Sequence, residues 1–207
     1  MNLLASTYVF SFYTLISRVL GYIRDILIAV FLGASVLADA FFVAFRIPNT
    51  FRRLFAEGTF NAAFIPSYTS EKLKSTSNGK KFADDVISLL LIILLAIIFI
   101  VEIFTPYLVY LIAPGFYDNS EKFGLAVDLT RITFPFLLFV SLSSFFSGVL
   151  NSNNKFAAAS AAPIILNIIL ILTLLIAYLL KLNFALSLSY GVTLSGIIQL
   201  IFLIIFS

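Results

Sequence analysis

The stretch VISLLLIILLAIIFIVEIFTPYLVYLI, residues 86–112, decides the fold class, because it is long and apolar and Glu102 is its only charged residue. A helix needs about 20 consecutive apolar residues to cross the hydrocarbon core of a bilayer. The whole chain shares this character, since 61% of its 207 residues are hydrophobic, 11% are charged and its mean hydropathy is +1.11. The sequence therefore predicts an all-α membrane protein that crosses the bilayer several times.

Apolar stretches of similar length lie on both sides of this one. We expect membrane-spanning helices at about 3–32, 36–57, 86–112, 128–150, 158–180 and 185–206, because each range is close to the roughly 20 residues that cross a bilayer. Together they would form a single transmembrane domain over residues 1–207. Between the second and third ranges we expect a short interfacial or re-entrant segment at about 59–70 and a polar loop at about 71–85.

The distribution of lysines predicts the orientation of these helices. Four lysines fall in the expected polar loop, and cytoplasmic loops of membrane proteins carry an excess of basic residues. This places the loop and the N-terminus in the cytoplasm. The opening residues MNLLAS lack the basic region of a signal peptide, so we expect the first helix to be retained. The last residues, LIIFS, directly continue an apolar run, which we interpret as a truncation.

Composition excludes most kinds of enzyme. The chain contains no cysteine and no histidine, which excludes disulfides, thiol nucleophiles, histidine bases and the usual zinc and haem sites. It also contains no GxxxxGK[ST] phosphate-binding loop. We therefore expect no enzyme activity, no cofactor and no metal. A net charge of +3, dispersed along the chain, also argues against a nucleic-acid partner.

The first two predicted helices are unusual because they carry many ionisable residues. On insertion scales an arginine or aspartate at the centre of a bilayer costs about 2.5 to 3.5 kcal/mol, so such helices need a water-filled cavity or protein partners around their charges. The arginines outnumber the carboxylates by five to three, which leaves positive charge for an anion. These residues are Arg18, Arg24, Arg46, Arg52, Arg53, Asp25, Asp39 and Glu57.

Arginine is the only basic residue type before position 60, which bears on the ligand. Its guanidinium is a rigid fork that binds phosphate or carboxylate through two hydrogen bonds, whereas lysine is a point charge. The sequence therefore predicts an anionic, phosphate-bearing ligand. Alternatively, the acids only pair with arginines and hold the bundle together, although buried ion pairs stabilise less than apolar packing. Arg52 and Arg53 also fit the role of topology signals or lipid-headgroup contacts.

Helical spacing predicts which of these residues share a face. Residues three, four and seven apart lie on one side of a helix, which places Thr14, Arg18 and Asp25 in one stripe. Arg24 lies about 100° away around the axis, on the side of Ser17.

On the second predicted helix Asp39 and Arg46 are seven residues apart and share a face. We expect Asp25 and Asp39 to orient arginines rather than to carry protons.

Other polar residues allow a simpler interpretation. Asn167 and Gln199, in the fifth and sixth predicted helices, fit interhelical hydrogen bonds. The small residues of the fourth predicted helix fit close helix packing rather than ligand binding, and they are Ser141, Ser143, Ser144, Ser147 and Gly148.

Three stretches of the sequence resemble a known family. They are SRVLGYIRDILIAVFLGAS (17–35), ADAFFVAFRIPNTFRRLFAEGTFNAAFIPSY (38–68) and LIAPGF (111–116). They closely resemble the N-terminal half of the bacterial lipid II flippases, the MurJ/MviN family, within the multidrug/oligosaccharidyl-lipid/polysaccharide exporter group. The resemblance implies one lobe of a two-lobed flippase with about fourteen helices, of which the C-terminal lobe is absent here.

The resemblance also implies a function and a location. Such proteins carry lipid II, a lipid-linked pyrophosphate precursor of peptidoglycan, from the cytoplasmic to the periplasmic leaflet of the bacterial inner membrane by alternating access. The implied partners are this substrate, membrane lipids and a separate C-terminal lobe. Arginines matching Arg18, Arg24 and Arg52 would face the cavity, and we add Ser17 and Arg53 to the expected substrate-binding residues. Acids matching Asp39 and Glu57 would support or gate the cavity, and we add Asp25 and Arg46 to this supporting group.

Two alternatives remain open at this point. The chain could be a non-transporting fragment, or half of a transporter that needs a second chain. It could also belong to another exporter of the same superfamily, for a lipid-linked polysaccharide or a drug. A cavity for cationic drugs would be rich in acids, so the excess of arginines argues against a drug exporter.

Overall fold

The computed structural model describes residues 3–56 and 59–207, and within them the side chains of all but residues 3–7, 9, 51–56 and 59. The described part is helical and contains no β-strand. The first four helices are α1 (Leu3–Leu32), α2 (Val36–Ala56), α3 (Thr59–Lys74) and α4 (Thr76–Ile112). After a short 3₁₀ turn, η1 (Pro114–Phe116), follow α5 (Ser120–Thr133), α6 (Phe136–Ser152), α7 (Phe156–Leu179) and α8 (Phe184–Phe206).

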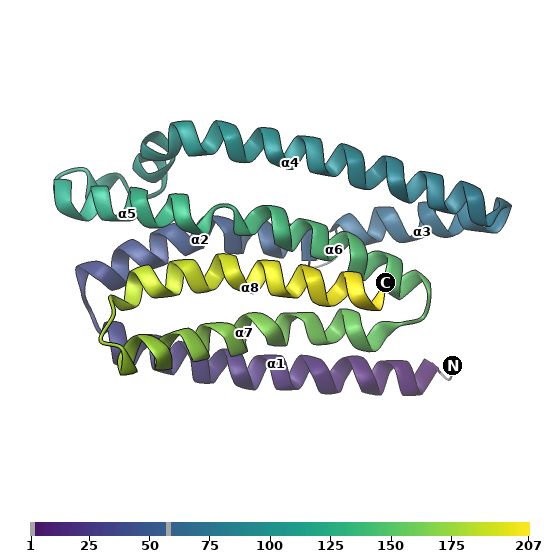
Figure 1. The fold of residues 1–207 in the computed structure, drawn as a ribbon, viewed down its shortest axis with the longest axis horizontal. Coiled ribbons are helices and arrows are strands. Elements are labelled where there is room, and N and C mark those ends of the chain that lie inside the picture. Colours follow the sequence, from purple (N-terminus) through teal and green to yellow (C-terminus); the bar gives the residue numbers. More distant parts are fainter. Residues whose placement is uncertain (1–2, 57–58) are drawn as a thin grey trace.

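The helices run roughly along the longest axis of the molecule (Figure 1). α1 packs on α7, α7 packs on α8, and α8 packs on α6. On the other side of α6, α2 packs against α5 and α3 packs against α4. The apolar core therefore lies around α5, α6 and α8, and it contains fully buried side chains such as Phe136, Leu170 and Leu188.

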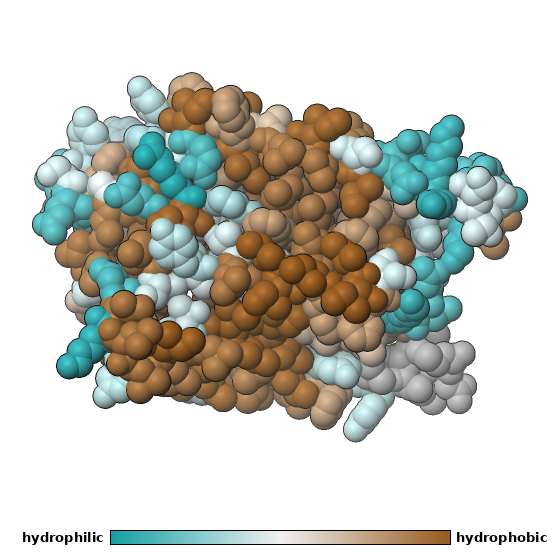
Figure 2. Space-filling view, viewed as in Figure 1, coloured by the Kyte–Doolittle hydropathy of each residue, from teal (hydrophilic) through white to brown (hydrophobic). Residues whose placement is uncertain are grey.

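The surface is suited to a lipid environment. Figure 2 shows hydrophobic residues across the middle of one face and hydrophilic residues toward its two ends. α4 is the extreme case, since only 6% of its most apolar stretch of 18 residues is buried. Residues such as Ile92, Phe99 and Leu111 are exposed. Exposed apolar area on this scale indicates contact with lipid or another apolar partner.

Four helical segments of the described chain are long and apolar enough to cross a membrane: Thr76–Ile112, Ser120–Ser152, Phe156–Leu179 and Phe184–Phe206. α1 and α2, with 30 and 21 residues, are also long enough, but they carry the charges described above. Their places as the first two spans stay predictions.

The predicted and observed helix ends agree for part of the chain. α1, α2, α7 and α8 begin and end within two residues of the predicted ranges. The range at 128–150 is wrong in its start, because the helical segment Ser120–Ser152 begins eight residues earlier, and a short break at Phe134 and Pro135 divides this segment into α5 and α6. Proline has no N–H to donate to the preceding turn, which explains the break.

The prediction of a polar loop at 71–85 is wrong, and so is the prediction that the next helix begins at residue 86. α3 continues to Lys74 and α4 already begins at Thr76. Ser75 caps α4, because its side chain accepts a hydrogen bond from the Asn78 N–H at 3.0 Å. Gly79 then lets the two helices approach closely, since a Cβ there would lie 2.9 Å from Lys72 Cβ. The polar residues thus form a tight helical hairpin rather than a loop.

Gly196 has a similar role where α8 crosses α6. A Cβ at this position would lie 2.7 Å from Phe136 Cδ2 and 3.0 Å from Phe139 Cβ. Phe136 is fully buried, so its ring has no free space to move into. Close approach of α8 to α6 therefore depends on the missing side chain.

We expect Gly196→Ala to destabilise the protein, because overpacking a core costs about 1–3 kcal/mol. Gly124→Ala is the matched control, since Gly124 lies in helix α5 and a Cβ there would meet no atom within 4 Å. There the higher helix propensity of alanine stabilises by about 0.5–1 kcal/mol. Thermal unfolding in detergent checks both variants, and equal melting temperatures for the two would contradict this packing.

Candidate functional site

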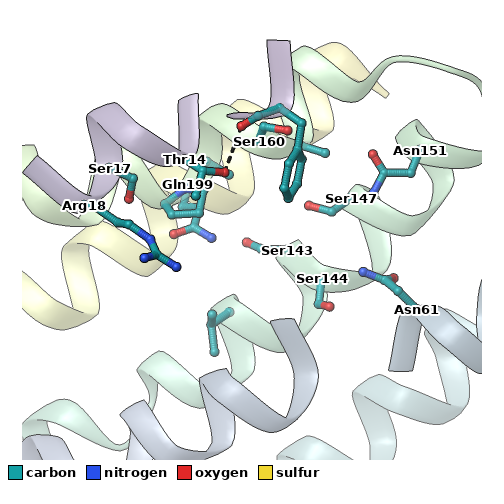
Figure 3. Close-up of a pocket in the computed structure, with 15 residues that line it drawn as sticks. Thr14, Ser17, Arg18, Asn61, Ser143, Ser144, Ser147, Asn151, Ser160 and Gln199 are labelled. Atoms are coloured by element: carbon teal, nitrogen blue, oxygen red, sulfur yellow. Dashed lines mark hydrogen bonds between the residues drawn. The ribbon is translucent and has the colours of Figure 1, made fainter. Parts of the chain in front are cut away.

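A cavity of about 420 Å³ lies between α1, α3, α6, α7 and α8 (Figure 3). Its apolar lining consists of Phe10, Val140, Ala159, Ala162 and Pro163. The rest of the lining is polar, which is unusual inside a bundle as apolar as this one, and indicates a polar ligand or water. These polar residues are Thr14, Ser17, Arg18, Asn61, Ser143, Ser144, Ser147, Asn151, Ser160 and Gln199.

Arg18 is the only charged residue among the described residues that line this cavity. Its guanidinium forms no hydrogen bond and no ion pair with any residue whose side chain the structure describes. Thr14, one helical turn earlier, lines the same side, and its hydroxyl donates to the Phe10 carbonyl at 2.8 Å. The stripe predicted on α1 thus brings Thr14 and Arg18 to the cavity, and Arg18 keeps its charge available there.

Arg24 is arranged differently. Its Nε and Nη2 donate to Asp25 Oδ1 at 2.9 and 2.7 Å, and its Nη1 donates to Asn167 Oδ1 on α7 at 2.7 Å. The Arg24 side chain is 18% exposed, whereas that of Asp25 is 64% exposed. The bond to Asn167 holds the guanidinium at the α1–α7 interface, and Arg24 is not part of the cavity lining. Asp25 therefore pairs with an arginine that is its neighbour in sequence, and its role in orienting that arginine for a ligand stays a prediction.

Asn167 connects this pair to the cavity. Its Nδ2 donates to the Ser17 carbonyl at 2.9 Å and to Ser17 Oγ at 3.3 Å. Gly21 lies beside this amide, and a Cβ there would make an ordinary van der Waals contact with it at 3.7 Å. The interhelical hydrogen bonds predicted for Asn167 are confirmed, and they fix the turn of α1 that carries Ser17 and Arg18.

Asp39 lies near the start of α2, outside the cavity. Its Oδ2 forms a 2.5 Å ion pair with Nζ of Lys122 on α5, and the same ammonium lies 4.2 Å from the centre of the Phe116 ring. Its partner is therefore a lysine, so the expectation that Asp39 orients an arginine is wrong for this structure. Arg46 is exposed and also lies outside the lining of the cavity.

Three predicted site residues are not placed by the structure. The backbone of Arg52 and Arg53 belongs to α2, but their side chains lie outside the described residues. Glu57 lies outside them altogether. Their proposed places at the cavity stay predictions.

Sequence reasoning missed the uncharged polar residues that α6 contributes to the cavity lining. Ser143, Ser147 and Asn151 follow one another at intervals of four residues, so they share one face of α6 and all line the cavity. The spacing was visible in the sequence, but small residues at this spacing also fit close packing. Gly148 does pack closely, since a Cβ there would lie 2.6 Å from Asn61 Oδ1.

Comparison with known proteins identifies the family. A family model described as lipid II flippase MurJ matches residues 28–207. The chain belongs to the MurJ family. This confirms the resemblance that the sequence motifs suggested, and MurJ proteins are membrane transporters rather than enzymes.

Individual MurJ relatives agree with this. The chain is 41% identical over 206 residues to a probable lipid II flippase MurJ of Rickettsia prowazekii. This alignment covers 99% of this chain and 40% of the relative. It is 44% identical over 192 residues to a probable lipid II flippase MurJ of Rhizobium tropici. This alignment covers 90% of this chain and 36% of the relative. The chain thus spans about 40% of the length of such MurJ proteins.

A solved MurJ structure shares the fold. The structure of a lipid II flippase MurJ in an inward closed conformation matches with a TM-score of 0.81 and 32% sequence identity. The match covers 94% of this chain and 41% of that MurJ chain. The helices described here therefore correspond to one part of a larger MurJ fold.

Proposed function

We propose that this chain forms the N-terminal lobe of a flippase that moves lipid II from the cytoplasmic to the periplasmic leaflet by alternating access. The observation that carries the proposal is the guanidinium of Arg18, which has no partner among the described side chains, in a polar cavity inside an apolar bundle. Membership of the MurJ family supports the choice of a lipid-linked precursor as cargo.

The chemistry of the cavity favours an anionic headgroup. A pyrophosphate would accept charge-assisted hydrogen bonds from Arg18, while the polyprenyl tail stays in lipid outside the bundle. No carboxylate is found among the described residues of the lining, so a cationic drug would meet no opposite charge there and would be repelled by Arg18. Outward movement of an anion across an inside-negative potential is favourable by about 2.3 kcal/mol per charge per 100 mV.

The proposed surroundings are the bacterial inner membrane, with the N-terminus in the cytoplasm. Since the chain spans about 40% of its relatives, we propose that a second lobe supplies the opposite wall of the path. Arg52 and Arg53 would add to the anion site, and Arg24, Asp25, Asp39, Arg46 and Glu57 would position or gate it.

Complementation tests this function. The chain is produced in a flippase-depleted bacterium, alone and together with the part of the Rickettsia relative that lies beyond the matched region. Lipid II in the outer leaflet is then measured with a reagent that does not cross the membrane. We expect outer-leaflet lipid II and growth to be restored when both lobes are present. If both lobes reach the membrane and outer-leaflet lipid II stays at the depleted level, the chain is a non-transporting fragment.

A further inference from the structure

The cavity has two chemically different sides. Arg18 extends from α1 on one side, and the side chains of Asn61, Ser143, Ser144 and Ser147 come from α3 and α6 on the other (Figure 3). From this second side we define the uncharged wall as Asn61, Ser143 and Ser147, together with Asn151 one turn further along α6. It contains hydroxyl and amide groups and no ionisable group.

Two atoms of the uncharged wall lack the hydrogen bonds that buried polar atoms normally form. Ser143 is 1% exposed, and its Oγ has no hydrogen-bond partner among the described residues. Asn61 Oδ1 is buried as well and also has none there. More than nine in ten buried polar groups in proteins are paired, so the unpaired hydroxyl of Ser143, a residue of the cavity lining, indicates that a ligand or water satisfies it. Asn61 Oδ1 lies beside Gly148, where α3 packs on α6.

The chemistry of the wall selects a class of ligand. A phosphate or carboxylate could use only the donors of the wall, because such an anion has no group that donates to the wall's acceptors. Sugar hydroxyls and the secondary amide of an N-acylated amino sugar each provide both donors and acceptors, which serine, asparagine and glutamine match. Gln199 of α8 lies at the same cavity and adds a further amide. A volume of about 420 Å³ also lies within the range of small-molecule pockets.

We propose that the uncharged wall binds the hydroxyl and amide groups of the sugar next to the pyrophosphate, while Arg18 binds the pyrophosphate itself. The inference rests on the proposed function and adds a determinant of specificity to it. Close helix packing alone would explain why the residues are small. It does not explain why Ser143 buries an unpaired hydroxyl in a residue that lines a cavity.

The structure offers a matched control on the same helix. Ser141 is fully buried in α6, and its Oγ also lacks a partner among the described residues, but Ser141 does not line the cavity. Ser143→Ala and Ser141→Ala therefore remove the same buried atom from the same helix. Only the first removes it from the proposed sugar site.

The test measures binding of two lipids to the 207-residue chain in nanodiscs by native mass spectrometry. One lipid is a polyprenyl pyrophosphate, and the other carries an N-acetylated disaccharide on the same pyrophosphate. We expect the sugar-bearing lipid to bind more tightly. Ser143→Ala should weaken its binding about three- to tenfold, the loss of one hydrogen bond, and leave the plain pyrophosphate unchanged. Ser141→Ala should change neither, and Ser147→Ala should act as Ser143→Ala does.

The outcomes separate the two claims. If neither lipid binds the unsubstituted chain, the proposed function is overturned. If both lipids bind equally well, or if Ser143→Ala and Ser147→Ala affect both lipids as Ser141→Ala does, the anion site stands and the sugar site is wrong.

Discussion

Replacing Arg18 with alanine is expected to weaken binding of a lipid-linked pyrophosphate to this chain about 10- to 100-fold. The guanidinium lines the cavity and has no partner among the described side chains, so its charge is free for the ligand. A hydrogen bond to a charged group contributes about 1.5–3 kcal/mol, and each 1.4 kcal/mol is about tenfold in affinity. Binding is measured with the plain polyprenyl pyrophosphate in nanodiscs.

Two further variants test why Arg18 matters. Arg18→Lys should recover only part of the affinity, because an ammonium keeps the charge but cannot form the paired hydrogen bonds of a guanidinium. Lys81→Ala removes a positive charge from an exposed position on α4, away from the cavity, and should leave binding unchanged. An equal loss with Lys81→Ala would mean that total charge rather than the cavity attracts the lipid.

Replacing Arg24 with alanine is expected to act mainly on stability. The variant loses a charged hydrogen bond to Asn167 across the α1–α7 interface, worth about 1.5–3 kcal/mol. The exposed pair with Asp25 adds little, because exposed ion pairs contribute about 0–1 kcal/mol. For a chain of this length a loss of about 2 kcal/mol lowers the melting temperature by about 4–8 °C.

A double-mutant cycle shows whether the effect travels through Asn167. Arg24→Ala and Asn167→Ala each remove one side of the same hydrogen bond, so the double variant should be less destabilised than the sum of the two. Binding should also fall in Asn167→Ala, because Asn167 holds the Ser17 turn that precedes Arg18. Strictly additive losses would show that Arg24 and Asn167 act separately.

Much of the fold follows from the sequence, and the errors have a common cause. Long apolar runs bounded by turn residues predict α1, α7 and α8 well, because burial in lipid and helix formation require the same residues. The polar stretch at 71–85 was expected to be a loop because it lacks apolar residues. Polarity reports only exposure, whereas the Ser75 cap and the close contact at Gly79 decide that these residues form a helical hairpin.

The candidate site was predictable in its residue types and only partly in its geometry. The excess of arginines on the first two helices indicated an anion site, and the spacing of Thr14 and Arg18 placed both on one face. Arg24 is bound by Asn167, whereas Arg18 has no partner among the described side chains. Asn167 lies 143 residues away from Arg24 in sequence. No local pattern contains that information. The serines of α6 share a spacing that fits both packing and binding, and only the cavity distinguishes the two.

The most direct test of this account is a solid-state NMR measurement of contact between the ³¹P nuclei of a bound polyprenyl pyrophosphate and ¹⁵N-labelled arginine side chains. The chain is studied in lipid bilayers, and Arg18→Lys assigns the signal. We predict a phosphorus–nitrogen contact that weakens clearly in Arg18→Lys, because only the contribution of Arg52 and Arg53 would remain. A bound lipid whose contact with arginine persists unchanged in that variant would contradict the claim that the free guanidinium of Arg18 holds the headgroup.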